Sequence, residues 1–282
     1  RYGTVTGVQT CALPILDFDV AVFTNLSQDH LDYHATMENY FAAKSQLFRH
    51  LGRYEKDGVA VVNVDDPYGR RLAQNLGGEN TVLTCGVSEL AAICARDVQV
   101  TREGTNFTAQ TPRGRFDVRL PLLGRYNVHN ALVAIGAALA MEIPVEAIAT
   151  GLGTMRAVPG RMERVPVSDP VDVYVDYAHT PEALRNVLLT VGELTRGRLI
   201  VVFGCGGDRD RGKRQPMGAA ACELADFSVI TSDNPRREEP RTILQQVQEG
   251  FPAAAKKNFM VIEERREAIE RALDIAREGD TV

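Results

Sequence analysis

The sequence predicts an α/β protein of two domains, and three observations lead to this prediction. The chain has 282 residues, which is more than one hydrophobic core usually needs. Hydrophobic residues make up 44% of the chain, as expected of a globular protein. After Pro166, strand-like and helix-like segments alternate strictly, which is typical of a mostly parallel sheet with helices on both faces.

Residues 1–15 stand apart from both predicted domains. The segment from Val5 to Ile15 resembles the in-frame translation of a common sequencing-library adapter, so we expect an assembly artefact in which Cys11 has no function. No basic region leads into its short apolar end, which argues against a signal peptide. A genuine but unusual N-terminus is the alternative. We expect the first domain over residues 16–157 and the second over residues 158–282.

The first domain is expected to open with a strand at residues 19–24, followed by an amphipathic helix from Thr36 onward. Residues 58–67 predict a second, buried strand. This strand must end in a turn, because Asp65 and Asp66 are followed by a proline. We expect the two aspartates to form that turn, although carboxylates at such a place could also be ligands.

The rest of the first domain is expected to hold more strands and one long helix. Residues 98–124 predict strands with turns at Gly104 and Gly114. Residues 127–141 predict a helix whose apolar face includes Leu132, Ile135 and Leu139. Residues 155–166 are expected to form a hinge, because Pro159 and Gly160 interrupt regular structure.

The second domain is expected to alternate strands and helices to the end of the chain. Strands are predicted at residues 171–176, 198–204, 227–232 and 259–262, with another starting at residue 279. Helices are predicted at residues 180–194, 215–225, 240–248 and 264–279. Thr180 is suited to cap the first of these helices, with Pro181 at its first position. In such a fold, ligands bind at the carboxyl ends of the strands.

Lys44 is placed unusually for a charged residue. It lies on the apolar stripe of the predicted helix, three residues after Phe41 and three before Leu47. Burial against apolar surface lowers the pKa of a lysine, and the neutral amine can take up carbon dioxide to become a carbamate. A carbamate supplies oxygen ligands for a hard metal such as magnesium. The alternative is a lysine whose stem is buried and whose ammonium reaches water.

The sequence around Lys44 resembles the central domain of the Mur ligases, which are ATP-dependent enzymes that build the peptide of peptidoglycan. The match is TNLSQDHLDYH, residues 24–34, followed by a helix that carries AAK. This resemblance implies that Lys44 is carbamylated and, with His30, holds a magnesium ion. Asp29, Asp32 and His34 lie close by in sequence and could complete the site.

Two further sequence motifs resemble motifs with which the Mur ligases bind ATP. GRYNVHNAL, from Gly124, resembles the adenine-binding word, so the resemblance gives that role to Asn127 and Asn130, whose amides can donate and accept at once. Ordinary helix capping is the alternative for Asn127. PGRMER, from Pro159, supplies Arg161, which by resemblance reaches the ATP phosphates and otherwise forms a surface ion pair.

In the predicted second domain, VDYAHTPEAL resembles the motif of the Mur ligases that faces the nucleotide. Its Asp176 could bind a ribose hydroxyl or cap the helix, and His179 could contact phosphate near the positive helix end. The glycine-rich FGCGGDRDRGKR follows a strand, and its Gly204, Gly206 and Gly207 would let backbone approach a ligand closely. Among its basic residues we expect Arg209 to contact substrate and others to form a solvated face.

TSDNPR, residues 231–236, follows the next predicted strand. DNPR resembles the signature of the Mur ligases that add meso-diaminopimelate, which assigns Asp233, Asn234 and Arg236 to substrate binding. Meso-diaminopimelate has a second carboxylate at its far end, with which Arg236 could pair. A plain Asn-Pro turn would explain Asn234 and its proline but not the arginine.

The resemblance as a whole implies a ligase that uses ATP and Mg²⁺ to join meso-diaminopimelate to UDP-N-acetylmuramoyl-L-alanyl-D-glutamate through an acyl phosphate, with Lys44, His30 and His179 in catalytic roles. Three motifs expected of the family do not occur in the sequence. They are the G-x-x-x-x-G-K-[ST] phosphate loop, an acidic motif that supplies another magnesium ligand, and a GKGHE motif. We therefore expect these 282 residues alone to be inactive.

The composition of the chain excludes several other classes of protein function. A formal net charge of -5 argues against a general nucleic-acid binder, and no apolar run is long enough to span a membrane. Five cysteines without C-x-x-C spacing indicate neither a zinc site nor a disulfide framework, so a reducing cytoplasm is expected. We also expect a monomer. The alternatives are an L-lysine-adding Mur ligase, a ligase resembling folylpolyglutamate synthase, and a non-catalytic nucleotide-binding remnant.

Overall fold

A computed structural model describes residues 18–51, 58–77, 81–156, 158–167, 170–252 and 258–282. The segment expected to be an artefact, residues 1–15, lies outside them. The chain divides into two compact units. Unit 1 combines the described residues up to Ser27 with His34–Arg156, and unit 2 combines Gln28–Tyr33 with Ala157–Val282. Each unit is described by itself.

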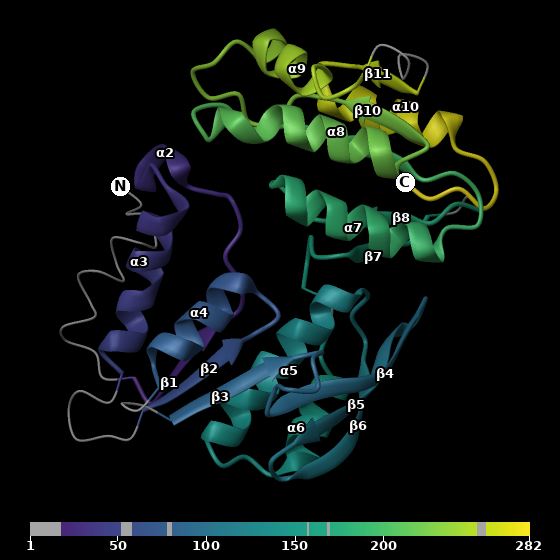
Figure 1. Ribbon diagram of the computed structural model, residues 1–282. Coiled ribbons are helices and arrows are strands. Elements are labelled where there is room, and N and C mark those ends of the chain that lie inside the picture. The colour runs from purple at the N-terminus through teal and green to yellow at the C-terminus, as the bar shows by residue number, and fades with distance from the viewer. Residues whose placement is uncertain (1–17, 52–57, 78–80, 157, 168–169, 253–257) are drawn as a thin grey trace. The chain divides into compact units, whose positions relative to one another are not determined.

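Unit 1 is built on a six-stranded sheet in the order β1-β2-β3-β4-β5-β6 (Figure 1). Strands β1 to β4 pair in parallel and β4 to β6 pair antiparallel. The strands are β1 (Val20–Phe23), β2 (Val59–Asn63), β3 (Thr81–Gly86), β4 (Ile93–Thr101), β5 (Gly104–Thr111) and β6 (Gly114–Leu120). The predicted turns at Gly104 and Gly114 are confirmed, with φ of 148° and 115°.

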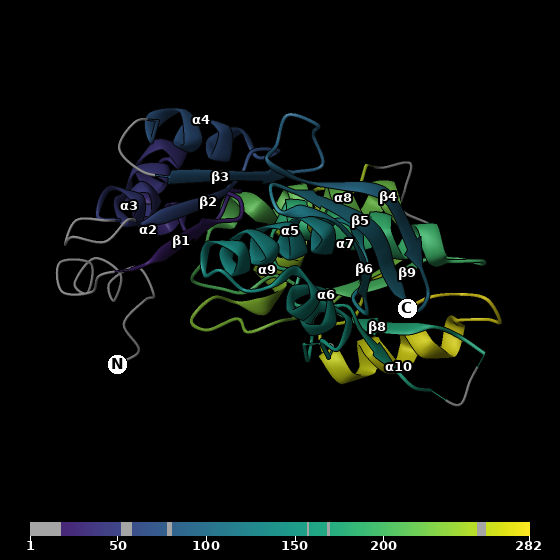
Figure 2. The ribbon, with the colours of Figure 1, turned by 90° about the horizontal axis from the view of Figure 1, so that it is seen from below.

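Helices cover both faces of this sheet, as Figure 2 shows for α4 and α5. The helices of unit 1 are α3 (Met37–Arg49), α4 (Pro67–Asn75), α5 (Arg125–Ala140) and α6 (Val145–Gly153), whereas the short helix α2 (Leu31–His34) falls mostly in unit 2. Strand β2 is buried on both sides, since Val61 packs in the cluster with α5 whereas Ala60 and Val62 pack in the cluster with α3 and α4. The predicted apolar faces of α5 and α3 are confirmed. Leu132 and Ile135 of α5 are fully buried, and Phe48 of α3 is almost fully buried.

The helix α4 was not predicted, because Asp65, Asp66 and Pro67 were interpreted only as a turn. The strand does end at Asn63, but Asp66 then caps a helix by accepting hydrogen bonds from the amides of Tyr68 and Gly69. Pro67 occupies the first helical position, where its missing N–H costs nothing.

Shortening a buried side chain in the unit 1 core should lower stability by a modest, measurable amount. Ile135 is fully buried in the cluster around α5, so we expect Ile135→Val to lower the free energy of unfolding by about 0.5–1.5 kcal/mol. The matched control is Ile143→Val, because Ile143 is 40% exposed in the same unit. Urea denaturation measures both, and equal losses would contradict the assignment of Ile135 to the core.

Unit 2 contains a parallel sheet in the order β11-β10-β9. The strands of this sheet are β9 (Ile200–Phe203), β10 (Phe227–Ile230) and β11 (Phe259–Val261), and β8 (Val173–Val175) belongs to a separate two-stranded sheet. The strand expected from residue 279 appears as two isolated parallel bridges, from Thr281 to Leu199 just before β9 and from Thr281 to Asp172 just before β8. Residues 163–165 of the expected hinge form β7 (Glu163–Val165), which pairs antiparallel with β8, and the role of residues 155–166 as a hinge stays a prediction.

Besides α2, the described part of unit 2 has four α-helices and a short 3-10 helix: α7 (Pro181–Leu194), η1 (Arg211–Lys213), α8 (Arg214–Leu224), α9 (Pro240–Gln248) and α10 (Arg265–Ile275). Thr180 caps α7 by accepting from the amide of Ala183, as predicted. Helix α10 packs on the sheet through Ala268 and Ala272, which lie against Ile200 and Val229.

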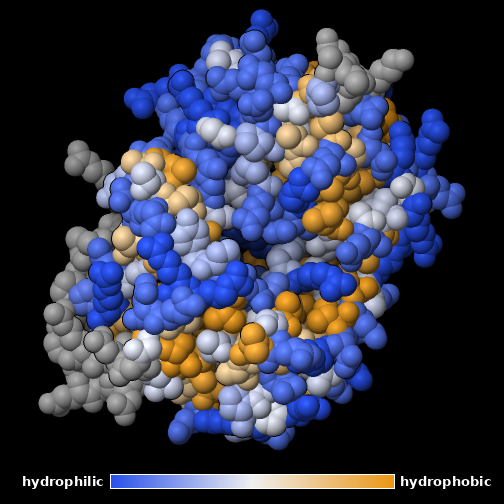
Figure 3. All heavy atoms as spheres, in the orientation of Figure 1, coloured by the Kyte–Doolittle hydropathy of each residue, from blue (hydrophilic) through white to orange (hydrophobic). Residues whose placement is uncertain are grey.

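The surface shown in Figure 3 is largely polar, and its apolar residues form separate patches. Within the described residues, none of the helices has the length and apolar character that crossing a lipid bilayer requires.

Candidate functional site

Lys44 lies half-buried on α3, among the apolar side chains of that helix face. Its Nζ atom is 5.2 Å from the centroid of the Tyr40 ring, and burial lowers the pKa of the amine. These are the conditions that the sequence predicted for a lysine with carbamate chemistry. Carbamylation itself stays a prediction.

His30, the second predicted magnesium ligand, belongs to unit 2, whereas Lys44 belongs to unit 1. Its backbone has a φ of 56°, an uncommon conformation for a residue other than glycine, and its amide donates to Asp29 Oδ1 at 2.9 Å. No group of three or more His, Cys, Asp or Glu side chains suited to a metal occurs within the described ranges. A magnesium site shared by His30 and Lys44 therefore stays a prediction.

His34, suggested as a further ligand, has a different environment. It is buried, and its ring stacks on that of Tyr40 with centroids 4.7 Å apart. Asp32 is exposed in α2. Neither observation supports a metal ligand at these two positions.

Asn127 and Asn130, the predicted adenine-binding residues, lie on the first turns of α5. Asn127 Nδ2 donates to the Leu123 carbonyl oxygen at 2.8 Å, and its Oδ1 accepts from Asn130 Nδ2 at 3.1 Å. The two amides are thus oriented by one hydrogen-bonded chain. Their contact with adenine stays a prediction.

Sequence reasoning missed a polar pair beside these asparagines. His129 Nε2 lies 2.9 Å from Asp65 Oδ2, and the same carboxylate oxygen accepts from the Val87 amide at 2.6 Å. Asp65 follows the carboxyl end of β2, where ligands bind in this class of fold. The sequence feature that could have indicated this pair is the histidine between the two asparagines of NVHN, residues 127–130.

In unit 2, three predicted nucleotide-binding residues gather just after β8. Asp176 Oδ2 accepts from the Met162 amide at 2.9 Å, which ties the segment before β7 to the end of β8. The Arg161 guanidinium lies 4.8 Å from the centroid of the Tyr177 ring, within the range of a cation–π contact. The Tyr177 ring in turn contacts His179 edge-on. The structure thus shows Arg161 against an aromatic face, where the alternative interpretation was a surface ion pair, and its contact with ATP phosphates stays a prediction.

His179 makes a second contact, with Asp29 of the same unit. Its Nε2 lies 3.3 Å from Asp29 Oδ2, while its Nδ1 lies 3.0 Å from the Tyr177 carbonyl oxygen. The hydrogen bond to Asp29 raises the pKa of His179 above its usual 6.5, against the opposing effect of burial. Burial opposes ionisation of Asp29 as well, but the hydrogen bonds from His179 and the His30 amide lower its pKa to about 2.

The sign of the linked stability follows from these two pKa shifts. A raised histidine pKa gives stability that is complete below pH 6.5 and is lost as the pH rises through the folded value. A lowered aspartate pKa gives stability that is complete above pH 3.8 and is lost as the pH falls toward about 2. The pair contributes most between these limits, and little overall, because both side chains are partly exposed.

Removing the Asp29 charge should therefore lower the pKa of His179. We expect Asp29→Asn to move the ring titration of His179, followed by NMR, toward the ordinary value of 6.5. Asp32→Asn is the control, because Asp32 is an exposed carboxyl in the same short segment. An unchanged titration in Asp29→Asn would contradict the contact.

The glycines after β9 pack against protein backbone. A Cβ atom on Gly207 would lie 1.9 Å from the Pro235 carbonyl oxygen, and one on Gly204 would lie 2.3 Å from that of Thr231. These glycines are thus required by the close approach of residues 231–236, which follow β10. The interpretation that they admit a ligand is not needed to explain them.

Of the residues predicted to bind substrate, Arg209, Asp233 and Asn234 are exposed after the ends of β9 and β10. Arg236 is exposed too, but its Nη1 donates to the Gly207 carbonyl oxygen at 2.6 Å. The structure therefore brings the two arginine-bearing loops together. The solvated basic face expected for some of the basic residues near Arg209 includes Arg211, whose side chain is 67% exposed, but not Lys213 and Arg214, which are 4% and 1% exposed.

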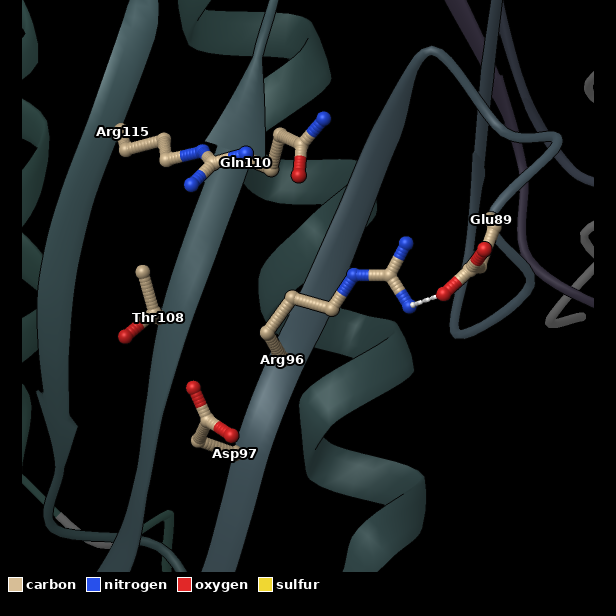
Figure 4. Close-up of a pocket in the computed structure, with 6 residues that line it drawn as sticks. All are labelled: Glu89, Arg96, Asp97, Thr108, Gln110 and Arg115. Carbon is tan, nitrogen blue, oxygen red and sulfur yellow. Dashed lines mark hydrogen bonds and ion pairs between the residues drawn. The ribbon is translucent and has the colours of Figure 1, made fainter.

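A pocket of about 350 Å³ lies elsewhere, on the outer face of β4 to β6 (Figure 4). It is lined by Glu89, Arg96, Asp97, Thr108, Gln110 and Arg115. Arg96 is paired with Glu89 at 2.6 Å, and the two acidic and two basic side chains cancel in charge. None of the predicted site residues lines this pocket.

Comparison with known proteins gives a consistent result for both units. A model of the Mur ligase middle domain matches residues 7–138, and a model of the Mur ligase glutamate ligase domain matches residues 160–282. The chain is 50% identical over 266 residues to UDP-N-acetylmuramoyl-L-alanyl-D-glutamate--2,6-diaminopimelate ligase of Gloeobacter violaceus, covering 94% of this chain and 53% of the relative. The protein of the same name from Synechococcus elongatus is 49% identical, with coverages of 94% and 52%.

Solved structures agree with this comparison. A structure of a UDP-N-acetylmuramoyl-L-alanyl-D-glutamate--2,6-diaminopimelate ligase is 37% identical with a TM-score of 0.62, covering 99% of this chain and 57% of that one. Folylpolyglutamate synthase of Mycobacterium tuberculosis shares the fold, with 22% identity, a TM-score of 0.78 and coverages of 95% and 61%. The chain spans about half the length of the curated relatives it matches.

Proposed function

The chain belongs to the Mur ligase family, whose members are ATP-dependent, ADP-forming ligases, and from this premise we propose its substrates. We propose that it is the central and C-terminal part of the ligase that adds meso-diaminopimelate to UDP-N-acetylmuramoyl-L-alanyl-D-glutamate. The names of relatives up to 50% identical support this proposal. It places the protein in peptidoglycan synthesis, and through that in cell shape and division.

The observation that carries the proposal is the pairing of the two loops after β9 and β10. The loop after β9 that contains Gly204, Gly206 and Gly207 is called the glycine loop. Arg236 lies against it with one guanidinium nitrogen bound to the Gly207 carbonyl oxygen, and no acidic side chain of the described residues pairs with Arg236. A guanidinium held in this way can receive the distal carboxylate of meso-diaminopimelate, which L-lysine lacks. Arg209 and Asn234, exposed on the same two loops, would contact the rest of the amino acid.

The reaction we propose begins when ATP phosphorylates the γ-carboxylate of D-glutamate. The amine of meso-diaminopimelate attacks the acyl phosphate, a tetrahedral intermediate forms, and phosphate leaves. Arg161, Asp176 and His179 would bind ATP phosphates and ribose after β8, and Asn127 with Asn130 would bind adenine. Groups that hold negative charge in place lower the barrier of phosphoryl transfer.

The chemistry of the proposed donors, Lys44 and His30, fits a magnesium ion. A desolvated amine such as that of Lys44 can become a carbamate, and we propose that this carbamate and His30 hold Mg²⁺. When bound, the ion would neutralise charge on phosphoryl oxygens. The cysteines of the described part are free thiols, three of them buried, which supports a reducing compartment. We propose a cytoplasmic monomer.

ADP release by the full-length protein encoded by the uninterrupted gene tests the proposed function. With ATP, Mg²⁺ and UDP-N-acetylmuramoyl-L-alanyl-D-glutamate, we expect ADP to form with meso-diaminopimelate as acceptor and far less with L-lysine. A folate substrate with glutamate should give none. A preference for lysine or folate would support one of those alternatives and refute the proposal.

The 282-residue chain alone is the negative control in this assay, since its sequence contains no G-x-x-x-x-G-K-[ST] phosphate loop. We expect it to form no ADP. Ligase activity from the chain alone would contradict this expectation.

A further inference from the structure

A buried ion pair lies beneath the two loops of unit 2. Arg214, at the start of α8, has a side chain 1% exposed, and the Glu238 side chain is 9% exposed. The pair is bidentate, with Arg214 Nη1 3.0 Å from Glu238 Oε2 and Nη2 2.8 Å from Oε1. Arg214 Nη1 also donates to Gln246 Oε1 at 2.6 Å, which ties the pair to α9. We call Arg214 and Glu238 the loop clamp.

The loop clamp also binds the glycine loop. Glu238 Oε1 accepts from the backbone amide of Asp208 at 2.6 Å, and Arg214 Nη2 lies 3.4 Å from the Gly206 carbonyl oxygen. The Glu238 amide donates to the Pro235 carbonyl oxygen at 3.0 Å, which anchors the residue to the loop after β10. One carboxylate therefore joins both loops. The Arg214 hydrogen bonds are the main cause that lowers the pKa of Glu238 to about 2, so it stays anionic at neutral pH.

Both loops carry uncommon backbone next to the clamp. Asp208 has a φ of 48° and Arg236 a φ of 51°, and neither is a glycine. Such residues persist only where their surroundings fix them. Here the Gly207 amide donates to the Asn234 carbonyl oxygen at 2.9 Å, and Arg236 Nη1 donates back to Gly207. The loops are thus bonded to each other in both directions, with the clamp below them.

A buried ion pair is weak as a source of stability, because desolvation offsets its attraction. Its geometry is nevertheless restrictive, since a bidentate pair fixes two groups in distance and in plane. This combination suits positioning better than stabilisation. A change in the clamp would move the Gly207 carbonyl group, and with it the Arg236 guanidinium.

We infer that the Arg214–Glu238 loop clamp is a positioning element that sets Arg236 relative to the glycine loop and so determines the affinity for the amino-acid substrate. This inference rests on the proposed function, which assigns Arg236 to that substrate. Arg214 and Glu238 themselves need not touch the substrate.

The first test uses hydrogen exchange in the 282-residue chain. In Glu238→Gln, the Asp208 amide loses a charged acceptor, so we expect its exchange to rise by about tenfold or more. Exchange in β10 should stay unchanged. The matched control is Glu239→Gln, because Glu239 is exposed and makes no capping hydrogen bond at the start of α9. Equal protection of Asp208 in Glu238→Gln, or faster exchange throughout β10, would overturn the inference.

The second test uses steady-state kinetics of the full-length protein. We expect Glu238→Gln to raise KM for the amino-acid substrate by about tenfold and to leave KM for ATP unchanged. In the Arg236→Ala background the same change should add little, because the clamp acts through Arg236. Additive effects, or equal rises in both KM values, would indicate a merely structural role and overturn the inference.

Gly207→Ala provides an independent variant that leaves the ion pair intact. Its Cβ would collide with the Pro235 carbonyl oxygen and push the loops apart, so KM should rise in the same selective way. No rise would count against the inference. A wild-type protein without ligase activity would refute the proposed function, whereas an active one whose Glu238→Gln variant keeps its KM would refute the positioning inference alone.

Discussion

Replacing Lys44 with alanine should lower the ligase activity of the full-length protein by roughly 100–1,000-fold, equivalent to about 3–4 kcal/mol of transition-state stabilisation. The side chain lies half-buried on α3, where burial lowers the pKa of its amine. In the proposed function this amine becomes the carbamate that holds magnesium. An alanine supplies no ligand, so the ion would lose one of its protein anchors.

Chemical rescue separates this role from a packing role. Acetate or formate should partly restore the activity of Lys44→Ala, because a small carboxylate can occupy the space of the carbamate and present similar oxygens. Arg49→Ala is the matched control, since Arg49 is an exposed cation on the same helix. Its activity should remain near that of the wild type. Full activity of Lys44→Ala without any added carboxylate would remove the carbamate role.

Local sequence signals predicted the elements that carry the candidate site. The helix of Lys44 followed from its apolar spacing and begins after Thr36, whose side chain accepts from the Asn39 amide. The helix after Thr180 followed from a threonine and a proline in the right order. Such features depend on neighbours within one or two turns, so a single sequence contains them.

Contacts between distant residues were not predictable in the same way. His129 meets Asp65 across 64 positions and Arg214 meets Glu238 across 24, and no periodicity encodes these pairings. Gly207 shows the same limit, because the sequence marks a close approach but does not name the partner. The structure identifies it as the backbone of Pro235.

Arg236→Ala should remove most of the preference for meso-diaminopimelate over L-lysine. We expect kcat/KM for meso-diaminopimelate to fall by roughly 10–100-fold, because a charge-assisted hydrogen bond is worth about 1.5–3 kcal/mol. The value for L-lysine should change little, since lysine has no second carboxylate to lose a partner. The variant should therefore lower kcat/KM for one substrate and leave kcat/KM for the other nearly unchanged.

The geometry of Arg236 explains why this loss should be selective. Its Nη1 donates to the Gly207 carbonyl oxygen, which holds one side of the guanidinium, and no carboxylate within the described part of the chain pairs with it. Arg241→Ala is the matched control, because Arg241 has a side chain 84% exposed and pairs with Glu263 at 3.5 Å in the same unit. Competition between the two amino acids in one assay measures the ratio directly. If Arg236→Ala lowers both kcat/KM values equally, Arg236 supports the loop and does not read the distal carboxylate.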